Sequence, residues 1–83
     1  MLFRHKLVRG FIMRLTDVSE GKTVYIKYIA VESNEAERLK SLGISGGGKI
    51  KVLYSNKRTG CVVVAGGDPV GLSRGVCERT EVE

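Results

Sequence analysis

The stretch at residues 35–52 limits the folds open to this chain more than any other, because it has the pattern of a short helix that stops and continues as a strand. Leu39 and Leu42 stand three residues apart, the spacing that places apolar side chains on one helix face. Gly43 occupies the position at which many helices end in a left-handed residue, and Ile44 is the apolar residue that commonly packs back on the last turn. Beyond the next glycines, polar and apolar residues alternate as in a half-buried strand. The stretch therefore predicts a helix with a defined end, followed directly by a strand.

The start of this helix is predicted by polar side chains. Ser33 and Asn34 can accept hydrogen bonds from the free N–H groups of a first helical turn. Asn34 and Glu37 have the N-x-x-E spacing of a capping box, in which two side chains accept from each other's backbone N–H groups. We therefore expect Asn34 to cap the helix.

Short strands and turns fill the rest of the chain. The first predicted strand, residues 22–29, is long enough to bend and serve two parts of a small barrel. Ser73 is placed to cap a single helical turn before the last strand. The further strands are predicted at residues 49–54, 61–65, 70–72 and 78–83. The pattern predicts a mainly β fold with an α insertion: a small, partly open, SH3-like five-stranded β-barrel with one helix between strands 1 and 2.

The net charge of the chain is concentrated at its start. The charge is +5 over 83 residues, yet residues 1–14 hold four cations and no acid, and the remaining ten Lys and Arg stand against nine Asp and Glu. We expect residues 1–12 to be a basic, flexible N-terminal tail and residues 13–83 to form one domain. The domain is thus nearly neutral, which argues against nucleic acid as a partner because phosphate contacts need excess cation.

Three segments of the chain match, in order, motifs that occur together in one protein family. The central motif, L-x-x-[LM]-G-[ILM]-x-x-G-x-x-[IV]-x-V, is matched by Leu39, Leu42, Gly43, Ile44, Gly47, Ile50 and Val52. The opening motif, L-x-x-[LV]-x-x-G, is matched at residues 15–21, and the closing motif, [AV]-L-R...A-x-x-I-x-V, is matched by Val70, Leu72, Arg74 and Val82. Together these segments resemble the ferrous iron transport protein A (FeoA) family. The sequence departs from the family pattern at Gly46, Cys77 and Thr80, where proline, alanine and isoleucine are usual.

The resemblance implies both a fold and a function. The implied fold is an SH3-like β-barrel with an α-helical insertion, similar to the C-terminal domains of iron-dependent repressors. The implied function is that of a non-enzymatic cytoplasmic accessory protein, which docks on the cytoplasmic part of FeoB, a membrane ferrous-iron transporter with a GTPase domain, and modulates iron uptake. The residues add one point: the single histidine has no serine or cysteine near it in the sequence, so no catalytic set is apparent.

We expect an apolar groove between the helix and the sheet to receive the partner. Its predicted lining residues are Leu39, Leu42, Ile44 and Leu53. Such a groove could accept an apolar side chain or a segment of another protein. The alternative is that each of the four is an ordinary core residue.

The weak candidates for metal ligands are His5, Cys61 and Cys77. Their side chains suit a transition metal, but metal sites gather His and Cys at close spacing and these residues are dispersed. We therefore expect no metal and no cofactor. The two cysteines are better explained as small buried hydrophobes in a reducing cytoplasm.

Two other functions stay open. A small barrel could bind nucleic acid through a basic stripe with aromatic stacking platforms, here formed by Lys22, Lys27, Lys49, Lys51, Lys57, Arg58, Tyr25 and Tyr54. A transition-metal-binding regulatory domain would need the dispersed ligands to converge, for example across a dimer, and the sequence leaves a homo-oligomer open. No apolar run approaches the roughly 18 residues of a membrane span, so we expect no direct membrane insertion.

Overall fold

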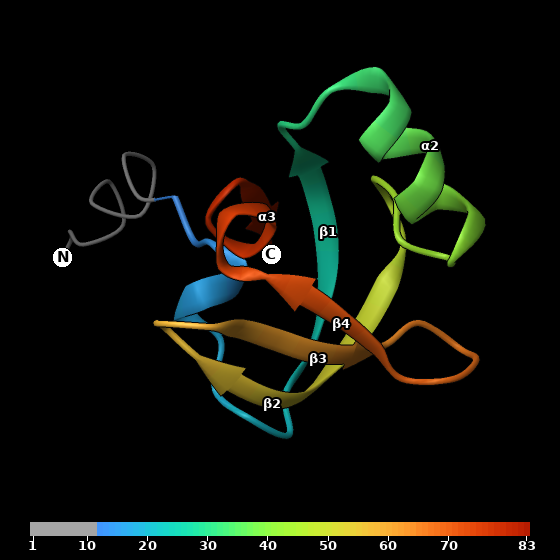
Figure 1. The fold of residues 1–83 in the computed structure, drawn as a ribbon. Helices are drawn as coiled ribbons and strands as arrows, with labels where there is room; N and C mark the ends of the chain where they lie inside the picture. The colour runs from blue at the N-terminus through green and yellow to red at the C-terminus, as the bar shows by residue number, and fades with distance from the viewer. Residues whose placement is uncertain (1–11) are drawn as a thin grey trace, which may run out of the picture.

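The computed structural model describes residues 12–83 of the chain, which form one sheet with short helical segments around it (Figure 1). The helical segments are η1 (Leu15–Asp17), a 3-10 helix, α2 (Ser33–Ser41) and α3 (Arg74–Glu78). The strands are β1 (Thr23–Ile29), β2 (Lys49–Asn56), β3 (Gly60–Val64), β4 (Val70–Ser73) and β5 (Thr80–Val82). Within residues 12–83 no helix has the length and apolar character needed to cross a membrane. The predicted basic tail lies outside the described residues except for Ile12.

The five strands pair antiparallel in the order β4-β3-β2-β1-β5. β1 bends as predicted from its length, because residues 23–25 pair with β2 whereas residues 26–29 pair with β5. The edge strands β4 and β5 are not paired with each other in the described part of the chain, so the barrel is partly open. With α2 inserted between β1 and β2, the predicted SH3-like fold class is confirmed.

The bend in β1 changes which side chains face the core. The register shifts between Ile26 and Tyr28, as at a β-bulge, which bends a strand and redirects the side chains that follow it. Ile26 is 1% exposed, whereas Tyr28 is 57% exposed and Ile29 packs against the core. Tyr28 therefore projects outward at the end of β1 from which the chain leads into α2.

The C-terminal end of α2 has the predicted form. Gly43 has a φ of 88°, and its N–H donates to the Lys40 carbonyl at 2.9 Å. The N–H of Ile44 donates to the Leu39 carbonyl, also at 2.9 Å. These two bonds are those of a Schellman motif, which satisfies the last carbonyl groups of a helix and requires a left-handed residue, here glycine.

The two α-helices begin differently. The predicted capping box at α2 is wrong, because the helix starts at Ser33 with Glu32 as its N-cap and no side chain accepts there. Asn34 therefore lies inside the first turn, where its side-chain oxygen accepts from the N–H of Glu35 at 2.9 Å. At α3 the prediction is confirmed, since the hydroxyl of Ser73 accepts from the third N–H of the helix at 3.4 Å.

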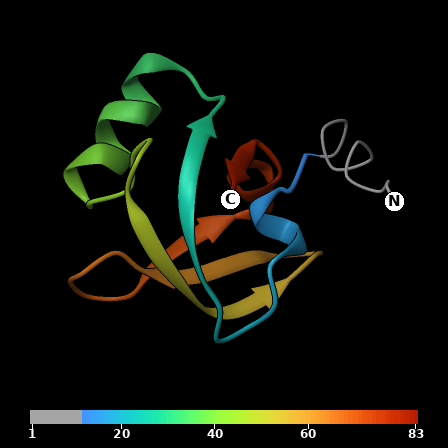
Figure 2. The same ribbon diagram turned by 180° about the vertical axis from the view of Figure 1, so that it is seen from behind.

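The core lies between the inner face of the sheet and the helical segments. Its fully buried side chains include Leu15, Ile26, Leu39, Ile44, Ile50, Val52, Val63 and Cys77. Thr80 is also buried, and its hydroxyl donates to the Val76 carbonyl at 2.8 Å. Because this bond satisfies the hydroxyl, a threonine is tolerated where the family usually has isoleucine. Seen from behind (Figure 2), η1 and α3 lie on one side of β1 and α2 lies on the other.

Candidate interaction surfaces

The four residues predicted to line a partner groove do not line one together. Leu39 and Ile44 are 0% and 1% exposed and belong to the core. For these two the structure agrees with the alternative of an ordinary core residue, because α2 turns Leu39 toward the sheet and the Schellman motif folds Ile44 beneath the helix end. Leu42 and Leu53 are 41% and 42% exposed, so they are the two candidates that another protein could reach.

Leu42 and Leu53 belong to different elements. Leu42 is the C-cap of α2, and a Cβ atom on the adjacent Gly43 would lie 3.4 Å from Ala65, just beyond the end of β3. Leu53 lies within β2 at the register shift between Val52 and Tyr54. Their use by a partner stays a prediction.

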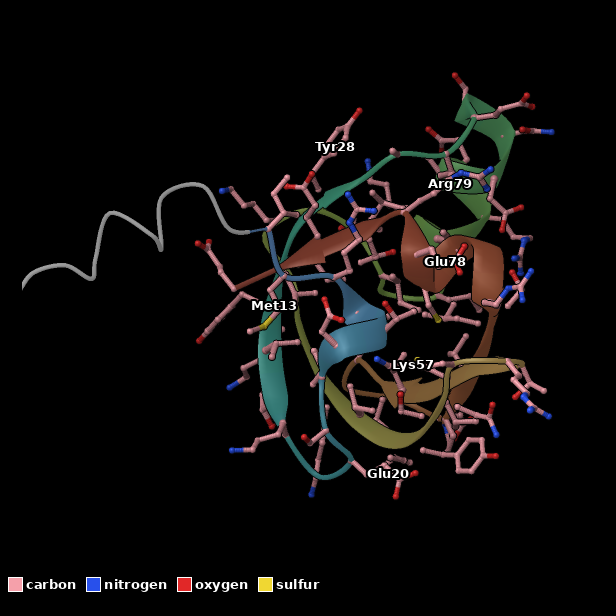
Figure 3. The ribbon with its side chains drawn as sticks, turned by 90° about the vertical axis from the view of Figure 1, so that its left-hand side faces the viewer. Met13, Glu20, Tyr28, Lys57, Glu78 and Arg79 are labelled. Atoms are coloured by element: carbon pink, nitrogen blue, oxygen red, sulfur yellow. The ribbon has the colours of Figure 1, made fainter. Side chains whose placement is uncertain are left out.

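An open groove lies between the start of α2 and α3, and we call it the α2–α3 groove. Its volume is about 690 Å³. Its lining residues come from the end of β1, the link into α2, the first turns of α2, and the segment from β4 through α3. They are Tyr28, Ala30, Val31, Glu32, Asn34, Glu35, Ser73, Gly75, Val76 and Arg79. Figure 3 shows Tyr28 and Arg79 toward the same end of the molecule, where α2 lies above α3.

The walls of the α2–α3 groove are joined by the backbone. The N–H of Ala30 donates to the carbonyl of Arg79 at 2.9 Å, which ties the link before α2 to the end of α3. Val31 packs against the core and Val76 is 8% exposed, so the two form an apolar lining. The groove is therefore built into the fold, and ordering it on binding should cost little conformational entropy.

Charged side chains stand around this apolar lining. Glu35 forms an ion pair with Arg38 at 2.6 Å, and the hydrogen bond and negative charge of Glu35 raise the pKa of Arg38. Among the described residues neither Glu32 nor Arg79 forms an ion pair. The groove thus offers a partner the carboxylate of Glu32 and the guanidinium of Arg79, whereas the carboxylate of Glu35 is already paired with Arg38. The sequence did not indicate this surface, because its lining residues are contributed by segments far apart in the chain.

The structure brings together two of the three metal-ligand candidates. Cys61 and Cys77 are free thiols with exposures of 4% and 0%, as expected for small buried hydrophobes. Cys61 pairs with Leu72 across β3 and β4, and the Cys77 sulfur lies 3.6 Å from the Leu72 carbonyl oxygen. Burial, and next the neighbouring Cys61 thiol, raise the pKa of Cys77 to about 12. The two cysteines are dispersed in the sequence, where sixteen positions separate them, but they are neighbours in the folded chain.

The described residues contain no group of three or more His, Cys, Asp or Glu side chains arranged to hold a metal ion. His5 lies outside the described residues. A metal site built from the two cysteines would therefore have to find its other ligands elsewhere, and the expectation of no resident metal stays a prediction.

The proposed nucleic-acid stripe is partly assembled on the outer face of the sheet. Tyr25 and Tyr54 are 51% and 47% exposed, and Tyr25 stands opposite Lys49 in the pairing of β1 and β2. On its other side Tyr25 exchanges two backbone hydrogen bonds of 2.9 Å with Glu83. Because directly paired residues share a face, a carboxylate interrupts the row, which weakens its attraction for phosphate.

An open antiparallel barrel of five strands with a helix inserted after the first is an SH3-like domain. The model of the FeoA domain matches residues 13–83 of the sequence. Because this match spans most of the sequence, the chain belongs to the FeoA family, as its three motifs predicted. The family is associated with ferrous iron transport.

Solved structures are similar over most of this chain. A crystal structure of an iron uptake regulatory protein (FeoA) has 23% identity, a TM-score of 0.76, and coverage of 88% of this chain and 97% of its own. The FeoA protein from Chlorobium tepidum has 26% identity, a TM-score of 0.76, and coverage of 86% and 69%. A manganese-dependent transcriptional repressor has 20% identity and a TM-score of 0.73; 86% of this chain corresponds to 40% of that repressor, a similarity of fold alone. A search of curated proteins found no match.

Proposed function

We propose that this chain is a cytoplasmic accessory of ferrous iron transport, which docks on the cytoplasmic part of a FeoB-type transporter and modulates iron uptake without catalysing a reaction. The observation that carries the proposal is the match of residues 13–83 to the FeoA domain. A small barrel that acts by docking needs a surface for its partner, and the α2–α3 groove has suitable properties.

The dimensions and chemistry of the α2–α3 groove support docking of a protein segment. Its volume of about 690 Å³ lies within the range of roughly 300–1,000 Å³ that is common for small-molecule pockets, so it has room for a side chain inserted from a partner. An apolar centre with a polar rim is also the usual anatomy of a protein interface. An apolar side chain of the transporter would rest on Val31 and Val76, while its polar neighbours meet Glu32 and Arg79.

Binding to the transporter's soluble cytoplasmic domain tests the proposal directly. The domain is immobilised, and retention of this protein is measured with and without guanine nucleotide. We expect retention in at least one nucleotide state. Absence of binding in every state, by a protein shown to be folded, would contradict the proposed function.

A matched pair of variants tests the location of the docking surface. Tyr28→Ala should weaken binding about tenfold, because exposed tyrosines at the centre of an interface often contribute more than 1 kcal/mol. Tyr25→Ala is the control, since Tyr25 is similarly exposed on the same strand but does not line the groove. A second pair tests the charge at the groove. Arg79→Glu should weaken binding, whereas Arg58→Glu is its control, because Arg58 lies in the turn between β2 and β3 and does not line the groove. Equal losses in both members of each pair would place the docking surface elsewhere.

A further inference from the structure

Docking leaves the buried cysteine pair without a role. Cys61 belongs to β3 and Cys77 to α3, two elements that pack together. Both residues adjoin Leu72: Cys61 is its backbone partner across the ladder, and the sulfur of Cys77 is 3.6 Å from its carbonyl oxygen. Both are free in this structure. Two adjacent thiols in one core are a chemical site and not merely two small apolar side chains.

We propose that Cys61 and Cys77 are an oxidisable dithiol, a modification site at which a disulfide bond between β3 and α3 forms in the presence of a low-molecular-weight disulfide such as oxidised glutathione. The inference is independent of the transporter, since it concerns the chemistry of this chain alone.

Charge favours a disulfide over a metal at this site. A monovalent soft metal ion held by two thiolates would leave one net negative charge in the core, and the buried residues of the described chain include no basic side chain to balance it. A disulfide is neutral and replaces two weak sulfur hydrogen bonds, at 3.6 and 3.8 Å. The oxidised pair is therefore compatible with the same apolar surroundings.

The reaction proceeds in two exchanges that balance in atoms and electrons. The thiolate of Cys61 attacks one sulfur of the small disulfide, which breaks the S–S bond and releases one thiolate that takes up a proton. The Cys77 thiolate then attacks the sulfur of Cys61 in the mixed disulfide and expels the second small thiol. Two electrons and two protons pass from the cysteines to the small disulfide, which becomes two thiols.

The order of these exchanges follows from access and acidity. Cys61 borders a surface depression lined also by Tyr54, Thr59 and Gly71, whereas Cys77 is fully buried. Because the thiolate is the attacking species, the raised pKa of Cys77 makes it a slow nucleophile. Cys61 is thus the residue that reacts first, and Cys77 resolves the mixed disulfide once α3 loosens.

The bond would fix α3 against the sheet. α3 contributes Gly75 and Val76 to the α2–α3 groove, so oxidation holds that wall of the groove in place. Cross-linking residues 61 and 77 also closes a loop in the unfolded chain, which lowers the entropy of that state. We expect the oxidised protein to have a melting temperature higher by roughly 10 °C or more.

Mass spectrometry of the folded protein tests the inference. The protein is incubated with oxidised glutathione, alkylated and digested with trypsin without reduction. Cleavage after Arg58, Arg74 and Arg79 separates residues 59–74, which hold Cys61, from residues 75–79, which hold Cys77. We expect these two peptides to stay joined until a reductant is added, and the intact protein to weigh two hydrogen atoms less.

Single variants identify the roles of the two thiols. Cys77→Ser should accumulate a glutathione adduct on Cys61, whereas Cys61→Ser should react at least about tenfold more slowly because the buried thiol remains alone. Three results with the unmodified sequence would overturn the inference: no oxidation of the folded protein, a stable glutathione adduct without the internal link, or a disulfide between two copies. Because these readouts use the unmodified sequence, they hold even if a variant folds poorly.

Discussion

At the scale of single residues, Gly60 is the position with the least room for a side chain. It begins β3, is buried, and has a φ of 126°. A Cβ atom there would overlap the carbonyl oxygen of Leu72 on the adjacent strand. Both the conformation and the contact therefore require glycine.

Replacement of this glycine should be severely destabilising. We expect Gly60→Ala to lower the free energy of unfolding by about 3 kcal/mol or more, since strain and overlap act together. Gly67→Ala is the control, because nothing lies within 4 Å of a Cβ at Gly67 and its φ is not positive; its effect should stay within about 0.5 kcal/mol. Urea unfolding of both variants measures the difference, and similar losses would argue against the close approach of β3 and β4.

The buried thiol of Cys77 makes stability depend on pH. Burial raises its pKa from the ordinary value of 9.0 to about 12. Above about pH 9 the unfolded chain gives up a proton that the folded chain keeps, so the contribution of this group is complete at lower pH and is lost as the pH rises toward 12. We expect urea midpoints to fall between pH 8 and pH 11, and to fall less in Cys77→Ala. The same pH slope in both proteins would contradict this assignment.

At the scale of elements, two leucines at the C-terminal end of α2, one inside the helix and one at its C-cap, give opposite expectations. Leu39 is fully buried and Leu42 is 41% exposed. Leu39→Ala should therefore cost about 2–5 kcal/mol of folding free energy, as is typical for a buried leucine, whereas Leu42→Ala should cost less than about 1 kcal/mol. Thermal or urea unfolding compares the two variants. Equal costs would mean that α2 presents a different face to the sheet.

How much of each element could be predicted from the sequence depends on how local its causes are. The end of α2 was predictable because Gly43 and Ile44 act through bonds within six residues. The start of α2 was not, since the helix begins at Ser33, where the N–H of Ala36 donates to the Glu32 carbonyl, so the expected cap falls inside the first turn. The spacing of Leu39 and Leu42 identified an apolar face, but the spacing cannot tell which residue sits at its buried centre.

The functional surfaces were less predictable than the elements. The α2–α3 groove joins residues from both halves of the chain, from Tyr28 to Arg79, so no short motif marks it. The cysteine pair was missed for the same reason, because strand pairing and the position of α3 bring together two thiols that are distant in sequence. Sites of this kind become visible when the topology is known.

At the scale of the whole molecule, α3 belongs both to the α2–α3 groove and to the buried cysteine pair. This short helix supplies part of the groove through Val76 and one of the two thiols through Cys77. It is capped by Ser73 at its start and is tied by the Arg79 carbonyl to Ala30 at its end. A change in the attachment of α3 should therefore alter docking, whereas changes on the outer face of the sheet should not.

Chemical-shift mapping of the complex tests the central claim most directly. The isotope-labelled protein is titrated with the soluble cytoplasmic domain of the transporter, and backbone amide shifts are followed. Docking in the α2–α3 groove predicts that the largest changes occur at Tyr28, Val31, Glu32, Val76 and Arg79, with little change at Tyr25 and Tyr54. Shifts confined to the second set, or no shifts at saturating concentration, would contradict it.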